Sequence, residues 1–305
     1  MTTPALRHFL DITDLSVAEL GTVLDLAERN GLPKVLDGTG VALIFEKPSN
    51  RTRHSMEMAV VQLGGHPVYT RGEEVGLDQR ESVEDVTRVM AGYHAVLAAR
   101  VFDHSRLERM AAVSEVPVVN MLSDYSHPLQ ALADVLTMRQ VHGPLTGCTV
   151  AYVGDYNNVS RSLAEACMLL GAHFSLGCPV GYDATPAEIE RLRTLGAATG
   201  ARVRQTTSPV EAVEGAIAVH TDTWVGMGME AEKAERLEIF RGYTVDEDVM
   251  GAAAQGAGFY HCLPAYRGYE VSAGVIDGPA SHVVAQAHNR MHAARGLLAF
   301  VGGVR

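Results

Sequence analysis

The sequence predicts an α/β protein of two doubly wound lobes, each a mainly parallel sheet flanked by helices, with the functional site in the cleft between them. Apolar, β-branched runs alternate with helical patterns along the chain, which is typical of parallel sheets covered by helices. At 305 residues the chain exceeds one typical domain. Hydrophobic residues make up 47% and charged residues 20%, which favours a large core over disorder.

The first lobe is predicted over residues 1–142. Ser16 and Glu19 form a capping box, and apolar residues follow at helical spacing until Gly31. Strands are predicted at 41–45, 66–70, 95–99 and 116–119, and helices at 51–63, 82–93, 104–113 and 127–142. The glycine- and proline-bearing loop 142–147 is the expected domain boundary.

The second lobe is predicted over residues 148–286. Its expected strands are 148–153, 173–178, 202–206, 216–220 and 258–261, with helices between them. The segment 287–301 has a helical pattern. We expect residues 287–305 to pack back on the first lobe.

Composition excludes several classes of function. The net charge of −11 argues against a nucleic-acid surface and against an anionic membrane surface. The N-terminus has no apolar signal core, and no apolar run approaches the length of a membrane span. The cysteines are scattered without the spacing of a metal site, so we expect no metal and a reduced, cytoplasmic setting.

The most informative segment is 49–53, Ser-Asn-Arg-Thr-Arg, which follows the apolar strand 41–45. A strand that leads through hydroxyl groups and arginines into a helix is suited to an anion, because backbone N–H groups, the helix dipole and guanidiniums act together. Arg51 and Arg53 would diverge on a regular helix, but at a loop-to-helix junction they can converge on one phosphate-sized group. A solvated pair of surface arginines is the alternative.

Polar residues also follow the other predicted strands. They are Arg100, Asn120, Asp155, Asn158, Asp222 and Cys262. Open α/β sheets bind ligands at the carboxyl ends of their strands, which is where a cleft between two lobes needs such groups. Strand ends are also exposed, and exposure alone accounts for polar residues there.

Two motifs have a chemical and a structural interpretation. His127 and Gln130 open a helix that has Pro128 in its first turn, so they can polarise a carbonyl group or merely cap the helix. Asp222 begins a glycine-bearing loop with the only tryptophan, Trp224. That loop suits closure over an ammonium-bearing substrate, or it is a structural turn.

Cys262 stands at a strand end and is either a small buried hydrophobe or a group that positions a substrate. His261 points to the opposite strand face, so Cys262 lacks the adjacent base that a nucleophile requires. The junction 154–158 lacks the three glycines of a dinucleotide fingerprint, which disfavours NAD. We therefore expect no cofactor.

Taken together and in this order, these motifs resemble the aspartate/ornithine carbamoyltransferase family, most closely its ornithine carbamoyltransferases. Residues 45–53 resemble the Ser-Thr-Arg-Thr loop, 127–130 the His-Pro-x-Gln motif, 222–230 the Asp-x-Trp-x-Ser-Met-Gly loop and 261–264 the His-Cys-Leu-Pro motif. The similarity extends from Arg7 to Arg290, nearly the whole chain.

The resemblance implies transfer of the carbamoyl group from carbamoyl phosphate to the δ-amine of L-ornithine, giving L-citrulline and phosphate, in arginine metabolism. It implies a homotrimer or an assembly of trimers, a carbamoyl-phosphate-binding domain at 1–142 and an ornithine-binding domain at 148–286. The implied carbamoyl-phosphate site is Ser49, Asn50, Arg51, Thr52, Arg100, His127, Gln130, Cys262, Leu263 and Arg290. The implied ornithine site is Asn158, Asp222, Gly226 and Met227, and the implied catalytic residues are Arg51, Arg100, His127 and Cys262.

Three positions depart from the family pattern. Asn50 replaces a threonine or serine, Leu129 replaces a frequent cysteine, and Gly226 replaces the serine of Ser-Met-Gly. Gly226 motivates an alternative acceptor, either putrescine or an N-acylated ornithine. A non-catalytic paralogue that binds a phosphometabolite is a further alternative. Within 73–81, the sequence does not decide whether Glu74 or Gln79 stands for the family's substrate-binding glutamine.

Overall fold

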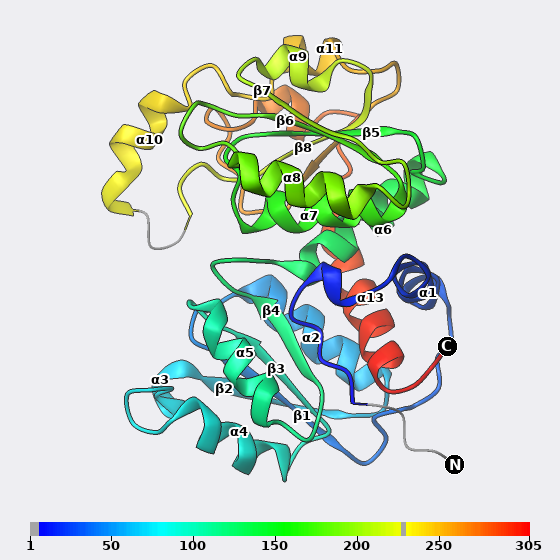
Figure 1. Cartoon of the computed structure of the whole chain (residues 1–305), viewed down its shortest axis with the longest axis vertical. Helices are drawn as coiled ribbons and strands as arrows, with labels where there is room; N and C mark the ends of the chain where they lie inside the picture. Colours follow the sequence, from blue (N-terminus) through cyan, green and yellow to red (C-terminus); the bar gives the residue numbers. More distant parts are fainter. Residues whose placement is uncertain (1–5, 227–229) are drawn as a thin grey trace. The chain divides into compact units, whose positions relative to one another are not determined.

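The computed structural model describes residues 6–226 and 230–305, and the chain divides into two compact units. Unit 1 comprises Met1–Ala133 and His288–Arg305, and unit 2 comprises Asp134–Ala287. Each unit is a parallel sheet flanked by helices, which confirms the predicted fold class (Figure 1). Across the described ranges, no helix combines the length and the apolar character needed to cross a bilayer.

The sheet of unit 1 has its strands in the order β2-β1-β3-β4, and all neighbouring pairs are parallel. The strands are β1 (Gly40–Phe45), β2 (His66–Arg71), β3 (Val96–Arg100) and β4 (Val118–Leu122). The direction of winding reverses between β1 and β3, where Phe45 lies opposite Arg100. In an open α/β sheet, ligands bind at the carboxyl ends of the strands beside such a reversal.

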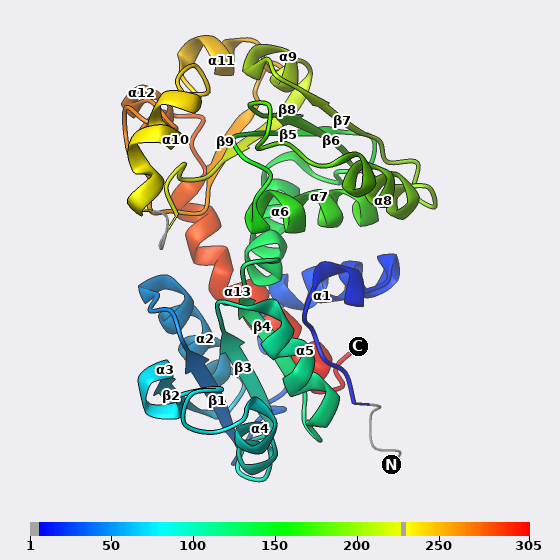
Figure 2. The same ribbon diagram turned by 60° about the vertical axis from the view of Figure 1, so that its left-hand side comes forward.

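Helices cover both faces of this sheet (Figure 2). They are η1 (Ile12–Asp14), α1 (Val17–Glu28), α2 (Asn50–Gln62), α3 (Gly72–Val75), α4 (Val83–Ala91), α5 (His104–Val113), the start of α6 (Pro128–His142) and most of α13 (Val283–Val301). Helices α4 and α5 bury Val83 and Leu107 against Ile44 of β1 and its neighbours. Helix α13 packs on α1 at Gly296, where an added Cβ would lie 2.7 Å from the Ala27 backbone nitrogen, so only glycine fits.

The sheet of unit 2 has the order β7-β6-β5-β8-β9, again with parallel neighbours. Its strands are β5 (Thr149–Val153), β6 (His173–Gly177), β7 (Val203–Thr206), β8 (Ala216–Thr221) and β9 (Gly258–His261). The winding reverses between β5 and β8, where Val153 lies opposite Thr221. The residues that follow β5 and β8 therefore occupy the usual ligand-binding edge of this sheet.

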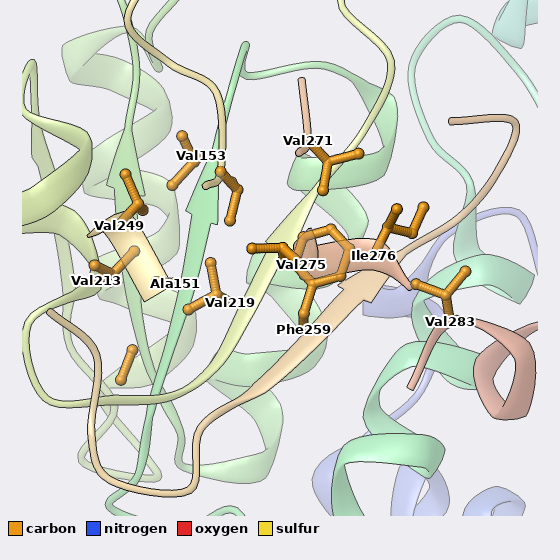
Figure 3. Packing of buried hydrophobic residues seen from close by; sticks show 12 residues of the cluster. Ala151, Val153, Val213, Val219, Val249, Phe259, Val271, Val275, Ile276 and Val283 are labelled. Carbon is orange, nitrogen blue, oxygen red and sulfur yellow. The ribbon is translucent and has the colours of Figure 1, made fainter. Parts of the chain in front are cut away.

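The helices of unit 2 also lie on both faces, with α7 and α8 on one face and α9 and α11 on the other (Figures 1 and 2). They are α7 (Asn158–Leu170), α8 (Pro186–Gly196), α9 (Pro209–Val213), η2 (Glu230–Glu232), α10 (Lys233–Ile239), α11 (Glu247–Gly251) and α12 (Ala273–Ile276). Figure 3 shows the core on the α9 side, where Val213, Val249 and Val275 pack with Val219 and Phe259 of the sheet.

The predicted strands are present, and a few boundaries differ. Helix α13 begins at Val283 rather than at 287, and β4 begins at Val118 rather than at 116. Asn120 therefore lies inside β4 and not beyond it; its Nδ2 donates to the Leu10 carbonyl at 2.8 Å. The two compact units divide inside α6, between Ala133 and Asp134, because the first turns of this helix pack within unit 1.

Candidate functional site

Helix α2 starts directly after β1 and exposes its N-terminus at the reversal point of unit 1. Ser49 is the N-cap, with an extended backbone, and its Oγ accepts the Thr52 N–H at 3.4 Å. The Ser49 hydroxyl also lies 3.1 Å from Thr52 Oγ1. The first N–H groups of a helix lack partners within the helix and carry its positive dipole end, so this junction favours an anion.

Two buried guanidiniums meet at Thr52. Arg100 ends β3, and its Nη1 donates to Thr52 Oγ1 at 3.4 Å. Arg290 comes from α13, far along the chain, and its Nη2 donates to the same oxygen at 3.0 Å. Arg290 Nη1 also donates to Gln130 Oε1. Both arginines are only 5% exposed, so unit 1 concentrates buried positive charge beside the α2 N-terminus.

His127 immediately precedes α6 and is 5% exposed. Burial holds the pKa of the His127 imidazole well below its usual value, and the nearby Arg290 and Arg100 guanidiniums lower it further. The imidazole is therefore neutral at pH 7. A neutral imidazole can donate a hydrogen bond to a carbonyl oxygen without adding a charge of its own.

Arg51 and Arg53 do not behave as a pair. Arg53 is exposed, donates to Glu57 at 2.8 Å and lies over the Tyr69 ring at 3.9 Å, so it does not converge with Arg51. Arg51 is half-buried, and its side chain makes no hydrogen bond or ion pair with the described residues. Asn50 is the first residue of α2 and is exposed. Of the two arginines, Arg51 is thus the one available to a ligand.

In unit 2, the β5–α7 junction holds a second helix start. Gly154 has φ +141°, and an added Cβ would lie 3.3 Å from the Tyr152 ring, so this turn requires glycine. Asn157 caps α7 by accepting the N–H groups of Val159 and Ser160. Asn158 is the first helical residue and is half-buried.

The ends of β8 and β9 bring an acid and a thiol together. Asp222 directly follows β8, and its Oδ1 accepts the Thr223 N–H at 2.8 Å. The Cys262 thiol, directly after β9, donates to the same Oδ1 at 2.8 Å. Leu263 follows Cys262 and packs against the core of unit 2. The two neighbouring strands thus bring the carboxylate and the thiol, both predicted as site groups from the sequence, into contact.

Sequence reasoning missed Arg236, which connects the Asp222 loop to the β5–α7 junction. Its Nη2 donates to Asp155 Oδ2 at 2.6 Å, and its Nε donates to the Trp224 carbonyl. Burial raises the pKa of Asp155 to about 6, and the Arg236 guanidinium opposes that rise. No motif or period marks Arg236, which stands in the charged helix α10; only the tertiary structure reveals its partners.

A cavity of about 150 Å³ lies beside the same loop. Its lining residues are Thr223, Trp224, Val225, Gly226, Lys233, Tyr266, Tyr269 and Glu270. Gly226 is half-buried at this wall. Met227, the other loop residue predicted to bind ornithine, lies outside the described residues.

Asp222, His261 and Cys262 place potential metal-ligating atoms within 4.8 Å of one another. His261 Nδ1, however, accepts the Leu263 N–H at 2.8 Å, and Nε2 faces the Glu270 carboxylate at 3.3 Å. Nδ1 is therefore occupied by a hydrogen bond, and Nε2 faces a carboxylate of the protein. The remaining carboxylate and thiol are fewer than the three or four protein ligands of an ordinary zinc site.

The two sites differ in their chemical capacity. Unit 1 offers guanidiniums, a helix N-terminus and a neutral imidazole, which together can hold a phosphate and polarise a carbonyl. Unit 2 offers a carboxylate hydrogen-bonded to a thiol, which can orient an amine. The predicted residues Ser49, Thr52, Arg100, His127, Gln130 and Arg290 gather in unit 1.

Two family models match the chain. The model described as "Aspartate/ornithine carbamoyltransferase, carbamoyl-P binding domain" matches residues 7–140, and the one described as "Aspartate/ornithine carbamoyltransferase, Asp/Orn binding domain" matches 146–301. The "Ornithine carbamoyltransferase" of Parafrankia sp. is 43% identical over 97% of this chain and 96% of that protein. The "Ornithine carbamoyltransferase, anabolic" of Pyrococcus furiosus is 41% identical over 98% of both.

A solved structure of the ornithine carbamoyltransferase from Pyrococcus furiosus is similar over the full length of both chains, with a TM-score of 0.94 and 40% identity. Similarity of this extent covers both units and every motif identified in the sequence. The chain belongs to the aspartate/ornithine carbamoyltransferase family.

Proposed function

We propose that this enzyme transfers the carbamoyl group of carbamoyl phosphate to the δ-amine of L-ornithine, forming L-citrulline and phosphate. The names of its relatives support ornithine as the acceptor. In this reaction the amine nitrogen bonds to the carbonyl carbon, the bond from that carbon to the bridging oxygen breaks, and the amine loses a proton. The leaving oxygen departs with the phosphate.

The donor phosphate is bound at the α2 N-terminus in this proposal. Ser49, Asn50 and Thr52 supply hydroxyl, amide and backbone donors, and Arg51 and Arg100 supply guanidiniums. A phosphate that accepts paired N–H donors is held in one orientation as well as by charge. The same cations stabilise the negative charge that grows on the leaving phosphate.

The carbonyl group of the donor is polarised by His127, Gln130 and Arg290. The neutral imidazole donates its N–H to the carbonyl oxygen, while the Arg290 guanidinium, already held by Gln130 and Thr52, faces the developing oxyanion. Preorganised donors of this kind act without rearranging as the reaction proceeds, so they lower the barrier effectively.

The acceptor amine is oriented by unit 2. A free δ-amine has a lysine-like pKa of about 10.4, so it must lose a proton before it can attack. Desolvation lowers the pKa of an amine. The Asp222 carboxylate, hydrogen-bonded to the Cys262 thiol, orients the amine of ornithine. Asn158, Gly226 and Met227 complete the amino-acid site in this proposal. Cys262 and Leu263 contact the carbamoyl group as well.

The observation that carries this proposal is the meeting of Arg100 and Arg290 at Thr52 Oγ1, beside the N-terminus of α2 and a neutral His127. Burying two guanidiniums next to each other is costly unless an anion or another acceptor compensates them. A bound phosphate adds a negative charge to the partners that Arg100 and Arg290 already have.

A colorimetric citrulline assay on the purified enzyme tests the function. Carbamoyl phosphate is offered with L-ornithine, putrescine and N-acetyl-L-ornithine in parallel, and kcat/KM is measured for each amine. We expect ornithine to be preferred by more than about tenfold, or about 1.4 kcal/mol. A tenfold preference for another amine contradicts the proposed acceptor, and no turnover with any amine contradicts the proposed reaction.

We propose further that residues 1–142, with the C-terminal 287–305, form the carbamoyl-phosphate-binding domain and that 148–286 form the ornithine-binding domain. The ranges matched by the two family models support these roles. We also propose that the enzyme is a homotrimer or an assembly of trimers and that it is cytoplasmic. Light scattering coupled to size-exclusion chromatography measures the mass of the assembly. Fractionation of cells measures the location of the enzyme.

A further inference from the structure

The turn that follows β9 has an unusual backbone. Leu263 has φ +58°, in the left-handed region that leucine rarely adopts. Such a conformation persists only where the surrounding structure holds it, and it is common at functional sites. Because Cys262 and Leu263 are the residues that the proposed function places at the carbamoyl group, the contacts that hold this turn bear on the reaction.

The His261 side chain holds the turn from within. Its Nδ1 accepts the backbone N–H of Leu263 at 2.8 Å. An accepting Nδ1 carries no proton, so the neutral ring has its proton on Nε2. This contact ties the imidazole to the peptide group between Cys262 and Leu263. That peptide group supplies the nitrogen about which the left-handed φ of Leu263 is measured.

Glu270 faces the other side of the ring. Its Oε1 lies 3.3 Å from His261 Nε2, at a distance of electrostatic contact but without the alignment of a hydrogen bond. The same oxygen accepts the Tyr266 N–H at 2.5 Å, and the Glu270 carbonyl accepts the Val245 N–H at 2.9 Å. A carboxylate beside Nε2 favours the tautomer that leaves Nδ1 free to accept.

The backbone that carries the imidazole is fixed as well. The His261 backbone N–H donates to Gln286 Oε1 at 2.9 Å, and His261 pairs with Thr221 in the parallel β8–β9 register. His261 is 1% exposed, so water does not compete for these contacts. A rigid strand, a buried ring and a buried carboxylate therefore define where the next two residues lie.

We propose that His261 and Glu270 are positioning residues that preset the Cys262–Leu263 turn for carbamoyl transfer. This inference rests on the proposed function for its kinetic consequence, but its structural content does not. The imidazole does not contact Cys262 as a base; it fixes the Leu263 N–H and thereby the direction of the Cys262 thiol toward Asp222.

Three variants separate positioning from simple stabilisation. His261→Leu removes the acceptor, whereas His261→Asn can return one, because an asparagine oxygen accepts the N–H two residues onward in an Asx turn. Phe259→Leu is the matched control: it lies on the same strand, and its buried ring packs in the core (Figure 3). Thermal unfolding shows whether the control loses as much stability as His261→Leu.

The first readout needs no catalysis. The rate at which iodoacetamide alkylates Cys262 is followed by mass spectrometry of the peptide that contains it. We expect at least a threefold change in His261→Leu, and rates close to wild type in His261→Asn and Phe259→Leu. An unchanged rate in His261→Leu, or an equal change in the control, overturns the proposal whether or not the enzyme makes citrulline.

The second readout is kinetic. In His261→Leu we expect kcat for citrulline formation to fall by between about tenfold and 10²-fold, because a reacting group displaced by about 1 Å costs this much. The KM for carbamoyl phosphate should stay within about threefold, since the proposed site for its phosphate group lies in unit 1. We expect His261→Asn to restore most of kcat and Glu270→Gln to lower it less than His261→Leu does. If both variants are folded and kcat falls equally in His261→Asn and His261→Leu, the positioning role is contradicted.

Discussion

The polar residues at the reversal points of the two sheets differ in charge and in how they are held. In unit 1, Arg100 and Arg290 come from a strand end and a distant helix and meet at Thr52. In unit 2, Asp222 and Cys262 come from adjacent strand ends and bond to each other. Two doubly wound parallel sheets thus carry a cationic cluster in one unit and an acid–thiol pair in the other.

This difference shows what the fold fixes and what it leaves to side chains. A parallel sheet delivers a helix N-terminus and several strand ends to one edge, whatever the ligand. In the proposed function, the sign of the charge placed there selects the ligand: a phosphate for unit 1 and an amine for unit 2. Substitutions that alter one cluster should therefore affect one substrate and spare the other.

The largest expected effect is that of Arg51→Ala in unit 1. Loss of a guanidinium that stabilises the leaving phosphate should lower kcat/KM for carbamoyl phosphate on the order of 10²-fold or more, equivalent to about 3 kcal/mol. Steady-state citrulline kinetics with varied carbamoyl phosphate measures this loss.

The neighbouring Arg53→Ala is its matched control. Arg53 pairs with Glu57 and lies over Tyr69, so its removal should change kcat/KM by less than about twofold. Similar losses in the two variants would mean that the segment has a structural role and that the contrast between these arginines is irrelevant.

Asp222→Asn probes the opposite cluster and should have the next largest effect. The variant keeps the side-chain shape but removes the charge that we propose faces the amine, so KM for ornithine should rise by about tenfold to 10²-fold. The affinity for carbamoyl phosphate should stay within about twofold. Asp248→Asn, an exposed change in the same unit, serves as the control. Equal weakening of both substrates would erase the distinction between the units.

One buried group in each unit should change the free energy of unfolding in opposite directions as the pH falls. Burial keeps His127 neutral in the folded protein, whereas the unfolded chain binds a proton there below pH 6.5. The contribution of His127 to stability therefore decreases as the pH falls. The pKa of Asp155 is raised from 3.8 to about 6, so the folded protein binds the extra proton and the Asp155 contribution rises as pH falls through 6.

Urea unfolding of His127→Asn and Asp155→Asn at about pH 6.5 and about pH 5 measures these slopes. Each group contributes at most about 1.4 kcal/mol per pH unit. Relative to wild type, acid should stabilise His127→Asn and destabilise Asp155→Asn. Parallel pH dependences in the two variants would show that the contrast between these buried groups is wrong.

The smallest effects concern the two helix caps. Ser49→Ala and Asn157→Ala each remove an N-cap acceptor and should each cost about 1 kcal/mol of unfolding free energy. Ser82→Ala, which uncaps α4, should cost a similar amount with normal kinetics. We expect Ser49→Ala to raise KM for carbamoyl phosphate as well. A Ser49→Ala enzyme with the kinetics of Ser82→Ala would limit Ser49 to capping.

Sequence reasoning succeeded where chemistry is local. The segment 41–52 predicts a strand, a helix cap and a helix start in succession, and the structure has each of them. Arg290 came only from the family resemblance, because nothing local on α13 marks its approach to Thr52. Arg236 and Glu270 escaped entirely, since their partners Asp155 and His261 are fixed by tertiary packing.

The most direct test of the account is a crystal structure of the enzyme with a bisubstrate analogue that joins a phosphonate to ornithine. The account predicts that the phosphonate receives hydrogen bonds from Arg51, Arg100 and Thr52, and that the amino-acid end reaches Asp222. A phosphonate bound away from these groups, with Arg51, Arg100 and Arg290 directed apart, would contradict it.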